Sequence, residues 1–205
     1  MTGLRVPPGR AGRVWLRERL GLAESALSLL EQKQAILDER LTGLRLRRDR
    51  TRADWTSAAA AADVWQARAA LLGGQWSLTF AATQPAELTV GTATVAGASY
   101  PDTALLSVPE DPPGRATGGT TMAAARAAAV AAVTAAAGHA VAAAAVQVVE
   151  QELAATGLRV RALRHRRIPA LRTALAELDL VLEERERAER ILPGRARAGG
   201  VGQEM

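Results

Sequence analysis

Cysteine is absent from this chain of 205 residues, and aromatic residues make up only 3% of it. Without cysteine the chain cannot form disulfides, cysteine zinc sites or a thiol nucleophile, which is compatible with a reducing cytosol. The scarcity of aromatic side chains argues against a compact globule. Alanine, leucine and arginine dominate instead, and such a composition is typical of long helices.

Nucleotide-binding loops and clustered metal ligands are also missing from the sequence. It contains no GxxxxGK[ST] phosphate-binding loop, so we expect this chain not to hydrolyse nucleotides itself. His139 and His165 lie far apart, with no cysteine or tight carboxylate cluster beside them, so we expect no metal site. The chain is therefore predicted to be non-catalytic, with no catalytic, cofactor-binding or metal-binding residues.

The longest apolar stretch, residues 123–149, consists mostly of alanine and valine. It is long enough to span a bilayer. However, it lacks Leu, Ile and Phe and contains Arg126, which costs roughly 2.5 to 3.5 kcal/mol near a bilayer centre. The basic start, MTGLRVPPGRAGR, lacks the apolar core of a secretory signal. We therefore expect neither direct membrane insertion nor a cleaved signal.

Apolar residues recur in alternating steps of four and three, which predicts a coiled-coil seam. The predicted seam residues are Leu16, Leu20, Leu27, Leu30, Leu37, Leu41, Leu44, Trp55, Trp65, Leu163, Ile168, Leu171, Leu175, Leu178 and Leu182. The phase of the second run shifts near Pro169. Because proline removes a helical hydrogen bond, we predict a helix kink at Pro169.

The fold is predicted to be mainly α, a long antiparallel two-helix coiled coil with a small central β-hairpin. The predicted segments are a flexible N-terminus (1–12), a first long helix (13–72), a hairpin and loop region (73–120), a second long helix (121–192) and a disordered tail (193–205). Gly73 and Gly74 provide the first helix stop, and β-branched runs between residues 76 and 108 predict the strands.

Charge and size both favour antiparallel pairing, in which the numbers of facing residues should add to roughly 200. The expected facing groups are Arg10, Arg13, Arg17 and Arg19 with Glu183, Glu184, Glu186 and Glu189; Glu31, Asp38 and Glu39 with Arg161, Arg164, Arg166 and Arg167; and the arginines from 45 to 52 with Glu150 and Glu152. Trp55 and Trp65 fall opposite the small residues of 137–145, as close packing requires. Exposed ion pairs contribute at most about 1 kcal/mol each, so they select the register while seam burial supplies stability.

The C-terminal stretch VRALRHRRIPALRTALAELDLVLEERERAE resembles the signature of the D subunit, the central-stalk component of V-type and A-type rotary ATPases. LRERL at 16–20 and LLEQKQAIL at 29–37, with Lys33 at the lysine position, look like the first helix of that family. TVAGASYP at 94–101 is similar to its hairpin. The sequence departs from the family pattern at Arg161, where asparagine is usual, at Arg164, where glutamate is usual, and at Gln34, where a basic residue is usual.

The resemblance implies a rotor shaft that transmits torque between an ATP-hydrolysing head and a membrane ion-translocating rotor. The paired helix ends would enter the head, and the implied head contacts are Arg10, Arg13, Glu184, Arg187 and Arg190. Other implied partners are a small stalk subunit and a membrane-side rotor subunit near the hairpin. The implied location is the cytoplasm, attached to the cell membrane through the larger complex. The transported ion, proton or sodium, stays open.

A net charge of +5 and a pI near 11 leave an alternative, a basic coiled-coil protein that binds nucleic acid or acts as a scaffold. The run from Arg40 to Arg52 motivates this alternative. Its arginines spread over several helical positions and lack interleaved aromatics, so we expect no nucleic-acid partner.

Overall fold

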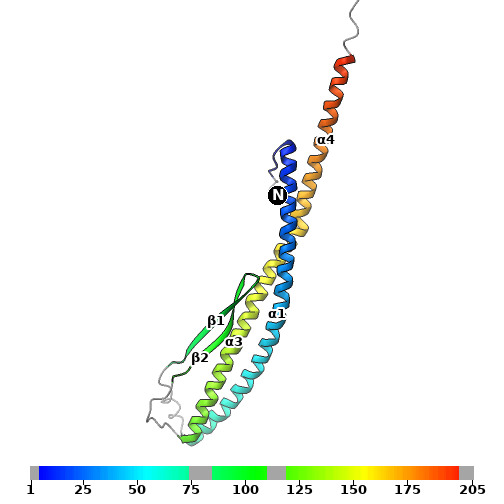
Figure 1. Cartoon of the computed structure of the whole chain (residues 1–205). Helices are drawn as coiled ribbons and strands as arrows, with labels where there is room; N and C mark the ends of the chain where they lie inside the picture. The colour runs from blue at the N-terminus through cyan, green and yellow to red at the C-terminus, as the bar shows by residue number, and fades with distance from the viewer. Residues whose placement is uncertain (1–4, 74–84, 110–118, 199–205) are drawn as a thin grey trace, which may run out of the picture. The chain divides into compact units, whose positions relative to one another are not determined.

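The computed structural model describes residues 5–73, 85–109 and 119–198, with side chains up to Arg190 in the last range. Its elements are α1 (Gly9–Gly73), β1 (Glu87–Val95), β2 (Ala98–Ser107), α3 (Gly119–Ala162), the π-helical turn η1 (Leu163–Arg167) and α4 (Ile168–Ala198) (Figure 1). Two long helices packing against each other and a two-stranded antiparallel sheet confirm the predicted fold class. The chain divides into two compact units, Met1–Lys33 with Thr156–Met205, and Gln34–Ala155. Helix α1 contributes to both.

In the first unit, the beginning of α1 packs antiparallel against η1 and α4 (Figure 1). Arg10 pairs with Glu186, whereas Glu31, further along α1, pairs with Arg164. As the residue numbers of the paired positions rise on α1, they fall on the partner helix, so the two helices run in opposite directions. The buried core of this unit is Leu16, Ala23, Ile168 and Leu171. Burial of these apolar side chains is the main source of the stability of this helix pair.

Helix α1 begins at Gly9, four residues before the predicted boundary, so part of the expected flexible N-terminus is helical. Gly12 is buried, and a Cβ atom there would collide with the carbonyl oxygen of Pro7. Val6 packs against the core of the unit. Because Gly12 has no side chain, the segment before the helix can lie directly against its first turn.

A π-helical turn precedes Pro169, where the sequence predicted a kink. The Ile168 N–H donates to the Leu163 carbonyl five residues earlier. In an α-helix residues five apart point to different sides, but the wider π turn lets Leu163 and Ile168 pack in the same core. Pro169 follows as the second residue of α4, within a continuous helical stretch, and it lacks the N–H that would continue the helical hydrogen bonds. The phase shift of the seam thus has a structural counterpart in η1, and a kink at Pro169 stays a prediction.

The second unit contains the remainder of α1, the hairpin and most of α3. Its core consists of Leu37, Leu41, Leu44, Ala98, Tyr100, Ala145, Val146 and Val149. A smaller cluster joins Ala69, Met122 and Ala125, with Trp65 packed against it. Trp65 therefore lies beside residues 122–125 rather than beside the predicted 137–145. The cause is the register, because facing numbers in this unit add to less than 200, as Arg45 with Glu150 and Trp55 with His139 show.

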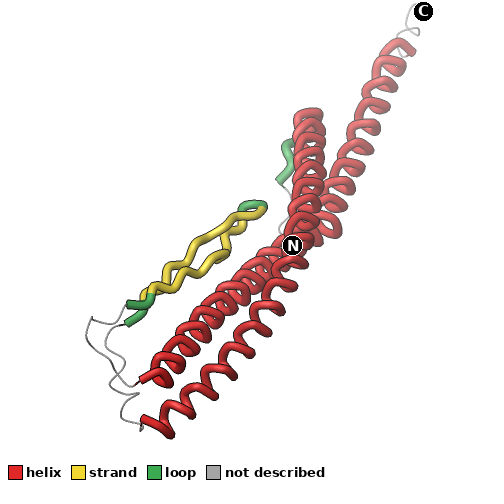
Figure 2. The backbone as a smooth tube through the Cα atoms, turned by 60° about the horizontal axis from the view of Figure 1, so that its bottom comes forward, coloured by secondary structure: helices red, strands yellow, loops and turns green. Residues whose placement is uncertain are grey.

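The hairpin lies beside the helices of this unit (Figure 2). Val95 and Ala98 flank a two-residue turn in which Ala96 and Gly97 both have positive φ, 46° and 80°. Positive φ at both positions suits the twist of paired strands. Near this turn Ala98 and Tyr100 are buried, whereas β1 is exposed from Glu87 to Val90. Only the turn half of the hairpin is therefore part of the core.

Two arginines of α1 hold the turn half of the hairpin in place. The Arg40 Nε donates to the Tyr100 hydroxyl at 2.8 Å. Arg47 donates from Nη1 to the Asp102 carboxylate and from Nη2 to the Asp102 backbone carbonyl, both at 2.7 Å. Charge-assisted bonds of this kind are stronger than neutral ones, so the strand is fixed against α1 in one position.

The last element, α4, continues to Ala198, six residues beyond the predicted helix end at 192. The rest of the predicted tail, residues 199–205, lies outside the described residues, as do residues 74–84 and 110–118 of the predicted hairpin and loop region.

By length and composition alone, the helical stretch Gly119–Arg190 contains a segment apolar enough to cross a membrane. Only 22% of that segment is buried. The same stretch supplies Ala145, Val146 and Val149 to the core of the second unit, and the core helix of a soluble protein passes the same test. The absence of membrane insertion therefore stays a prediction.

Candidate functional site

The beginning of α1 and the second half of α4 carry a network of exposed charges. The Arg10 Nη2 donates to the Glu186 Oε1 at 3.1 Å, and the Arg190 Nη2 lies 3.9 Å from the other oxygen of Glu186. Arg187 lies 3.8 Å from Glu183, one turn earlier on α4. The side chains of Arg10, Arg187 and Arg190 are 74–82% exposed. Such pairs are weak in water, so these guanidinium groups can exchange their partners for those of another protein.

Arg13 and Glu184, the other two predicted head contacts, lie in different surroundings. The Arg13 Nε lies 3.0 Å from the Asp179 Oδ1, and both atoms are buried without a well-oriented hydrogen bond in the described part of the chain. Arg13 therefore faces the helix pair. Glu184 is exposed and has no ion-pair partner among the described residues. Asp179 was not among the predicted site residues, although its place directly after Leu178 puts it at the edge of the seam.

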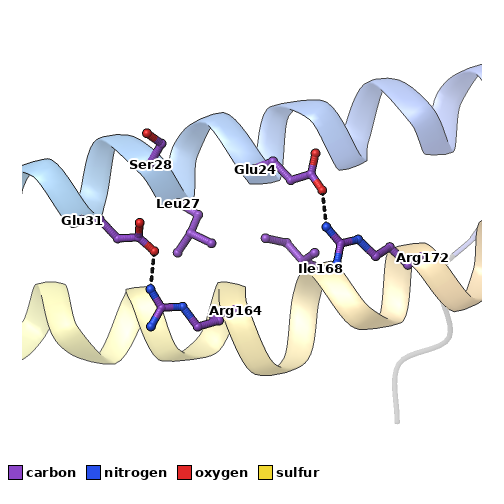
Figure 3. Close-up of a pocket in the computed structure, with 7 residues that line it drawn as sticks. All are labelled: Glu24, Leu27, Ser28, Glu31, Arg164, Ile168 and Arg172. Atoms are coloured by element: carbon purple, nitrogen blue, oxygen red, sulfur yellow. Dashed lines mark hydrogen bonds and ion pairs between the residues drawn. The ribbon is translucent and has the colours of Figure 1, made fainter.

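A surface groove lies between α1 and the C-terminal half of the first unit (Figure 3). Leu27 and Ile168 contribute its apolar lining. The Arg164 Nη2 donates to Glu31 at 2.5 Å on one side of these residues, and Arg172 donates to Glu24 at 2.6 Å on the other. The groove has a volume of about 220 Å³. Glu31 was expected to face the arginines from 161 to 167, and it contacts Arg164. The pair between Glu24 and Arg172 was not foreseen.

Polar and aromatic contacts also join the helices of the second unit. The Arg45 Nη2 donates to the Glu150 Oε1 at 2.7 Å. Trp55 stacks on His139, with ring centroids 5.4 Å apart and an interplanar angle of 13°. Trp55 is 39% exposed, so it lies at the edge of the helix pair rather than within its core. His139 falls within the predicted facing range of 137–145.

The predicted seam residues differ in burial. Leu16, Leu37, Leu41, Leu44, Ile168 and Leu171 are buried, while Leu20, Leu27, Leu30, Trp65, Leu163, Leu175, Leu178 and Leu182 are half-buried. Their assignment as one continuous seam stays a prediction. Tyr100 and Asp102 of the hairpin, which contact α1, were missed because no local pattern relates them to Arg40 and Arg47.

Four of the six arginines between positions 40 and 52 have acidic partners within the chain. Arg40 and Arg47 contact Asp102, Arg45 contacts Glu150, and Arg48 contacts the adjacent Asp49 at 2.8 Å. A phosphate-binding surface needs cations that are free to displace counterions. The run therefore offers fewer unpaired cations than its sequence suggests, and the absence of a nucleic-acid partner stays a prediction.

Within the described ranges, no group of three His, Cys, Asp or Glu side chains could hold a metal ion. The expectations of no catalytic, cofactor or metal site stay predictions. What these residues do provide is exposed charge at the helix ends and a small groove with an apolar floor. Both features can bind the surface of another protein.

Comparison with known proteins agrees with the architecture. No match was found among curated proteins. The family model of the ATP synthase D subunit matches residues 14–193, a range that includes the hairpin and most of both long helical regions. This match confirms the resemblance found in the sequence. The chain therefore belongs to the family of ATP synthase D subunits, the stalk subunits of rotary ATPases.

Proposed function

We propose that this chain is the central-stalk rotor subunit of a V-type or A-type ATPase and transmits torque between the head and the membrane rotor. The observation that carries the proposal is the antiparallel pairing of α1 with the C-terminal half of the chain, found in each unit. A torque-bearing element must resist twisting. A buried leucine core combined with ion pairs between helices, such as Glu31 with Arg164 and Arg45 with Glu150, opposes sliding and rotation of one helix on the other.

The head contacts in this proposal are Arg10, Arg13, Glu184, Arg187 and Arg190. Four of these side chains are exposed or bound only by weak surface pairs, which supports their use in contacts that change partner as the shaft turns. Arg13 is the exception. Its guanidinium pairs with Asp179 of α4, so Arg13 fixes the position of α1 on α4. In this proposal it supports the head contact indirectly, by positioning the exposed residues around it.

The hairpin supplies a separate surface for a small stalk subunit and a membrane-side rotor subunit. Leu88 and Val90 lie on one face of its outer half and are 45–49% exposed. Exposed apolar residues gathered on one short element are typical of a protein interface. In this proposal the chain is cytoplasmic and bound to the membrane through its complex, the partners hydrolyse ATP, and the alanine-rich part of α3 serves helix packing.

Truncation of the helix ends tests the proposed torque transmission. A chain lacking the residues before Leu20 and after Leu178 loses the pairs of Arg10 with Glu186 and Arg13 with Asp179. In a reconstituted complex we expect ATP hydrolysis to persist while ATP-driven ion pumping falls to background. A matched control that removes only residues 199–205 should pump normally. Normal pumping by the doubly truncated chain, with the truncated protein present in the complex, would contradict the proposal.

A further inference from the structure

The two edges of the hairpin differ in what they offer to another strand. Within the described residues the sheet consists of β1 and β2 alone, so each strand has one edge that faces no other strand. The edge of β2 is interrupted, because the pairing skips Asp102, which forms a bulge, and Arg47 occupies the backbone carbonyl of Asp102. Pro101, beside the bulge, has no N–H to donate. A further strand therefore cannot pair along β2 without a break.

The free edge of β1 has no comparable obstruction. This strand runs over nine residues without a bulged residue or a proline, and Glu87 is its only charged residue. Natural edge strands are usually protected by prolines, bulges or charges, because their unpaired backbone groups bind other strands. A long edge without such protection is suited to the addition of a strand from another protein.

The turn identifies the backbone groups at this edge. Val95 and Ala98 flank a two-residue turn, so they form a pair that exchanges backbone hydrogen bonds. The backbone groups of successive residues in a strand point to opposite edges. The residues whose N–H and C=O groups point to the free edge are therefore Leu88, Val90, Thr92 and Thr94. In agreement with this assignment, Thr92 pairs with Pro101, which has no N–H to donate.

The side chains of the same four residues point away from the helices. Ala93 and Val95 pack against the core of the second unit, and side chains alternate between the two faces along a strand. Leu88 and Val90 therefore lie on the outward face, where they are 45–49% exposed. The two threonines nearer the turn share this face and are exposed. The outward face of β1 is thus apolar in the outer half of the hairpin and carries hydroxyl groups towards the turn.

We infer that the free edge of β1 binds an extended segment of a partner protein, which adds to the hairpin as a third, antiparallel strand. Backbone hydrogen bonds along the edge would supply affinity, and two apolar side chains of the segment beside Leu88 and Val90 would supply specificity. Glu87 has no ion-pair partner among the residues that the structure describes, so a basic residue at the end of the segment would complement it. The inference rests on the hairpin contact of the proposed function, and not on torque transmission.

A second copy of the chain fits this edge less well. Full-length antiparallel pairing of two β1 strands would set Leu88 beside Thr94 of the other copy, and Val90 beside Thr92. Such mixed pairs lose the apolar contacts that cross-strand neighbours can make. A segment of another protein can match both the apolar and the hydroxyl-bearing half of the edge.

Fluorescence anisotropy with the full-length chain tests the inference. The probe is a labelled nine-residue peptide with threonine at positions 2 and 4, valine at 6, leucine at 8, lysine at both ends and serine elsewhere, which matches β1 in antiparallel register. Val90→Pro removes an N–H from the free edge and should weaken binding about tenfold. Val90→Ala, which keeps that N–H, should weaken it less than about threefold.

A matched proline on the other strand controls for damage to the hairpin. Ala104 pairs directly with Val90, and the N–H that Ala104→Pro removes faces the edge of β2. The affinity of this variant should stay within about twofold of the unaltered chain. Circular dichroism checks the folding of each variant. No binding of the peptide, or equal losses in Val90→Pro and either control variant, would overturn the inference.

Two further measurements separate the possible occupants. A peptide with serine in place of valine and leucine should bind several-fold more weakly, and an undiminished affinity would contradict the proposed side-chain contacts. Sedimentation velocity should give the same molecular mass for the unaltered chain and for Val90→Pro. A larger mass for the unaltered chain would assign the edge to a second copy and overturn the inference. These assays use the chain alone, so their failure would leave the ion-pumping test of the truncated chain unaffected.

Discussion

At the scale of single residues, position relative to the seam decides what a leucine contributes. Leu16 and Leu22 lie in the same stretch of α1 and in the same unit, but Leu16 is fully buried and Leu22 is 65% exposed. The difference follows from helical geometry, because the two residues lie six positions apart and point to different sides. Two leucines of equal hydrophobicity therefore contribute very differently to the stability of the folded chain.

Alanine substitution of these two leucines measures the difference directly. Leu16→Ala should lower the free energy of unfolding by about 2–5 kcal/mol, because it leaves a cavity beside Ile168 and Leu171. Leu22→Ala should change it by no more than about 0.5 kcal/mol. Urea denaturation followed by circular dichroism at 222 nm gives both values. Comparable effects of the two substitutions would show that α1 does not bury this face.

At the scale of elements, η1 is the feature that adjusts the helix to its partner. Leu163 and Ile168 are five residues apart, yet both pack in the core of the first unit. In an ordinary α-helix, two neighbouring side chains that point into the same core are three or four residues apart. We expect the additional residue and Pro169 to belong together, because a π turn before a proline would move the preceding carbonyl groups away from its ring.

Deleting His165 separates the roles of the π turn and the proline. The deletion restores a spacing of four between Leu163 and Ile168 and allows an uninterrupted α-helix. The proline ring would then meet the carbonyl four residues earlier, so the deletion alone should cost about 3 kcal/mol of stability. Combining it with Pro169→Ala should recover most of that loss, while Pro169→Ala alone serves as the control. A deletion that costs nothing, or a loss that the second change fails to rescue, would refute this account of η1.

At the scale of the whole molecule, the register between α1 and the C-terminal half is the quantity on which the proposed function depends. Facing numbers add to 195 for Glu31 with Arg164 in the first unit and for Arg45 with Glu150 in the second. The sum predicted from the sequence was roughly 200, so the predicted direction of pairing is correct and the predicted register is displaced by several residues. Two further contacts, Trp65 near Met122 and Arg13 with Asp179, depart from 200 in the same direction.

Distances between spin labels check this register, and the absence of cysteine makes labelling specific. Labels at Glu18 and Glu177 in the first unit, and at Thr56 and Ala140 in the second, should report neighbouring helices. Their separations should equal an interaxial distance of about 8–10 Å plus the two label arms. Labels at Glu18 and Gln32, about 21 Å apart along α1, give an internal standard. A separation for the first pair well beyond this standard would exclude the antiparallel arrangement in that unit.

Much of the fold was accessible from local patterns. The alternation of four and three predicted the helices, charge complementarity predicted their opposite directions, and β-branched runs between residues 76 and 108 predicted the hairpin that β1 and β2 form. Of the candidate site residues, the exposed positions of Arg10, Arg187 and Arg190 agree with a contact surface, whereas the partner of Arg13 was not foreseen. The groove escaped notice because its lining comes from residues more than a hundred positions apart.

The helices follow from the periodicity of apolar residues, the direction of their pairing from the order of charges along the chain, and family membership from the order of the motifs. All three can be read from the sequence without coordinates. The contacts of Arg40 and Arg47 with the hairpin, the π turn before Pro169 and the groove beside Arg164 were visible only in the folded chain. Each of these depends on the register of distant segments. Sliding one helix by a few residues leaves every local pattern intact but brings different side chains together.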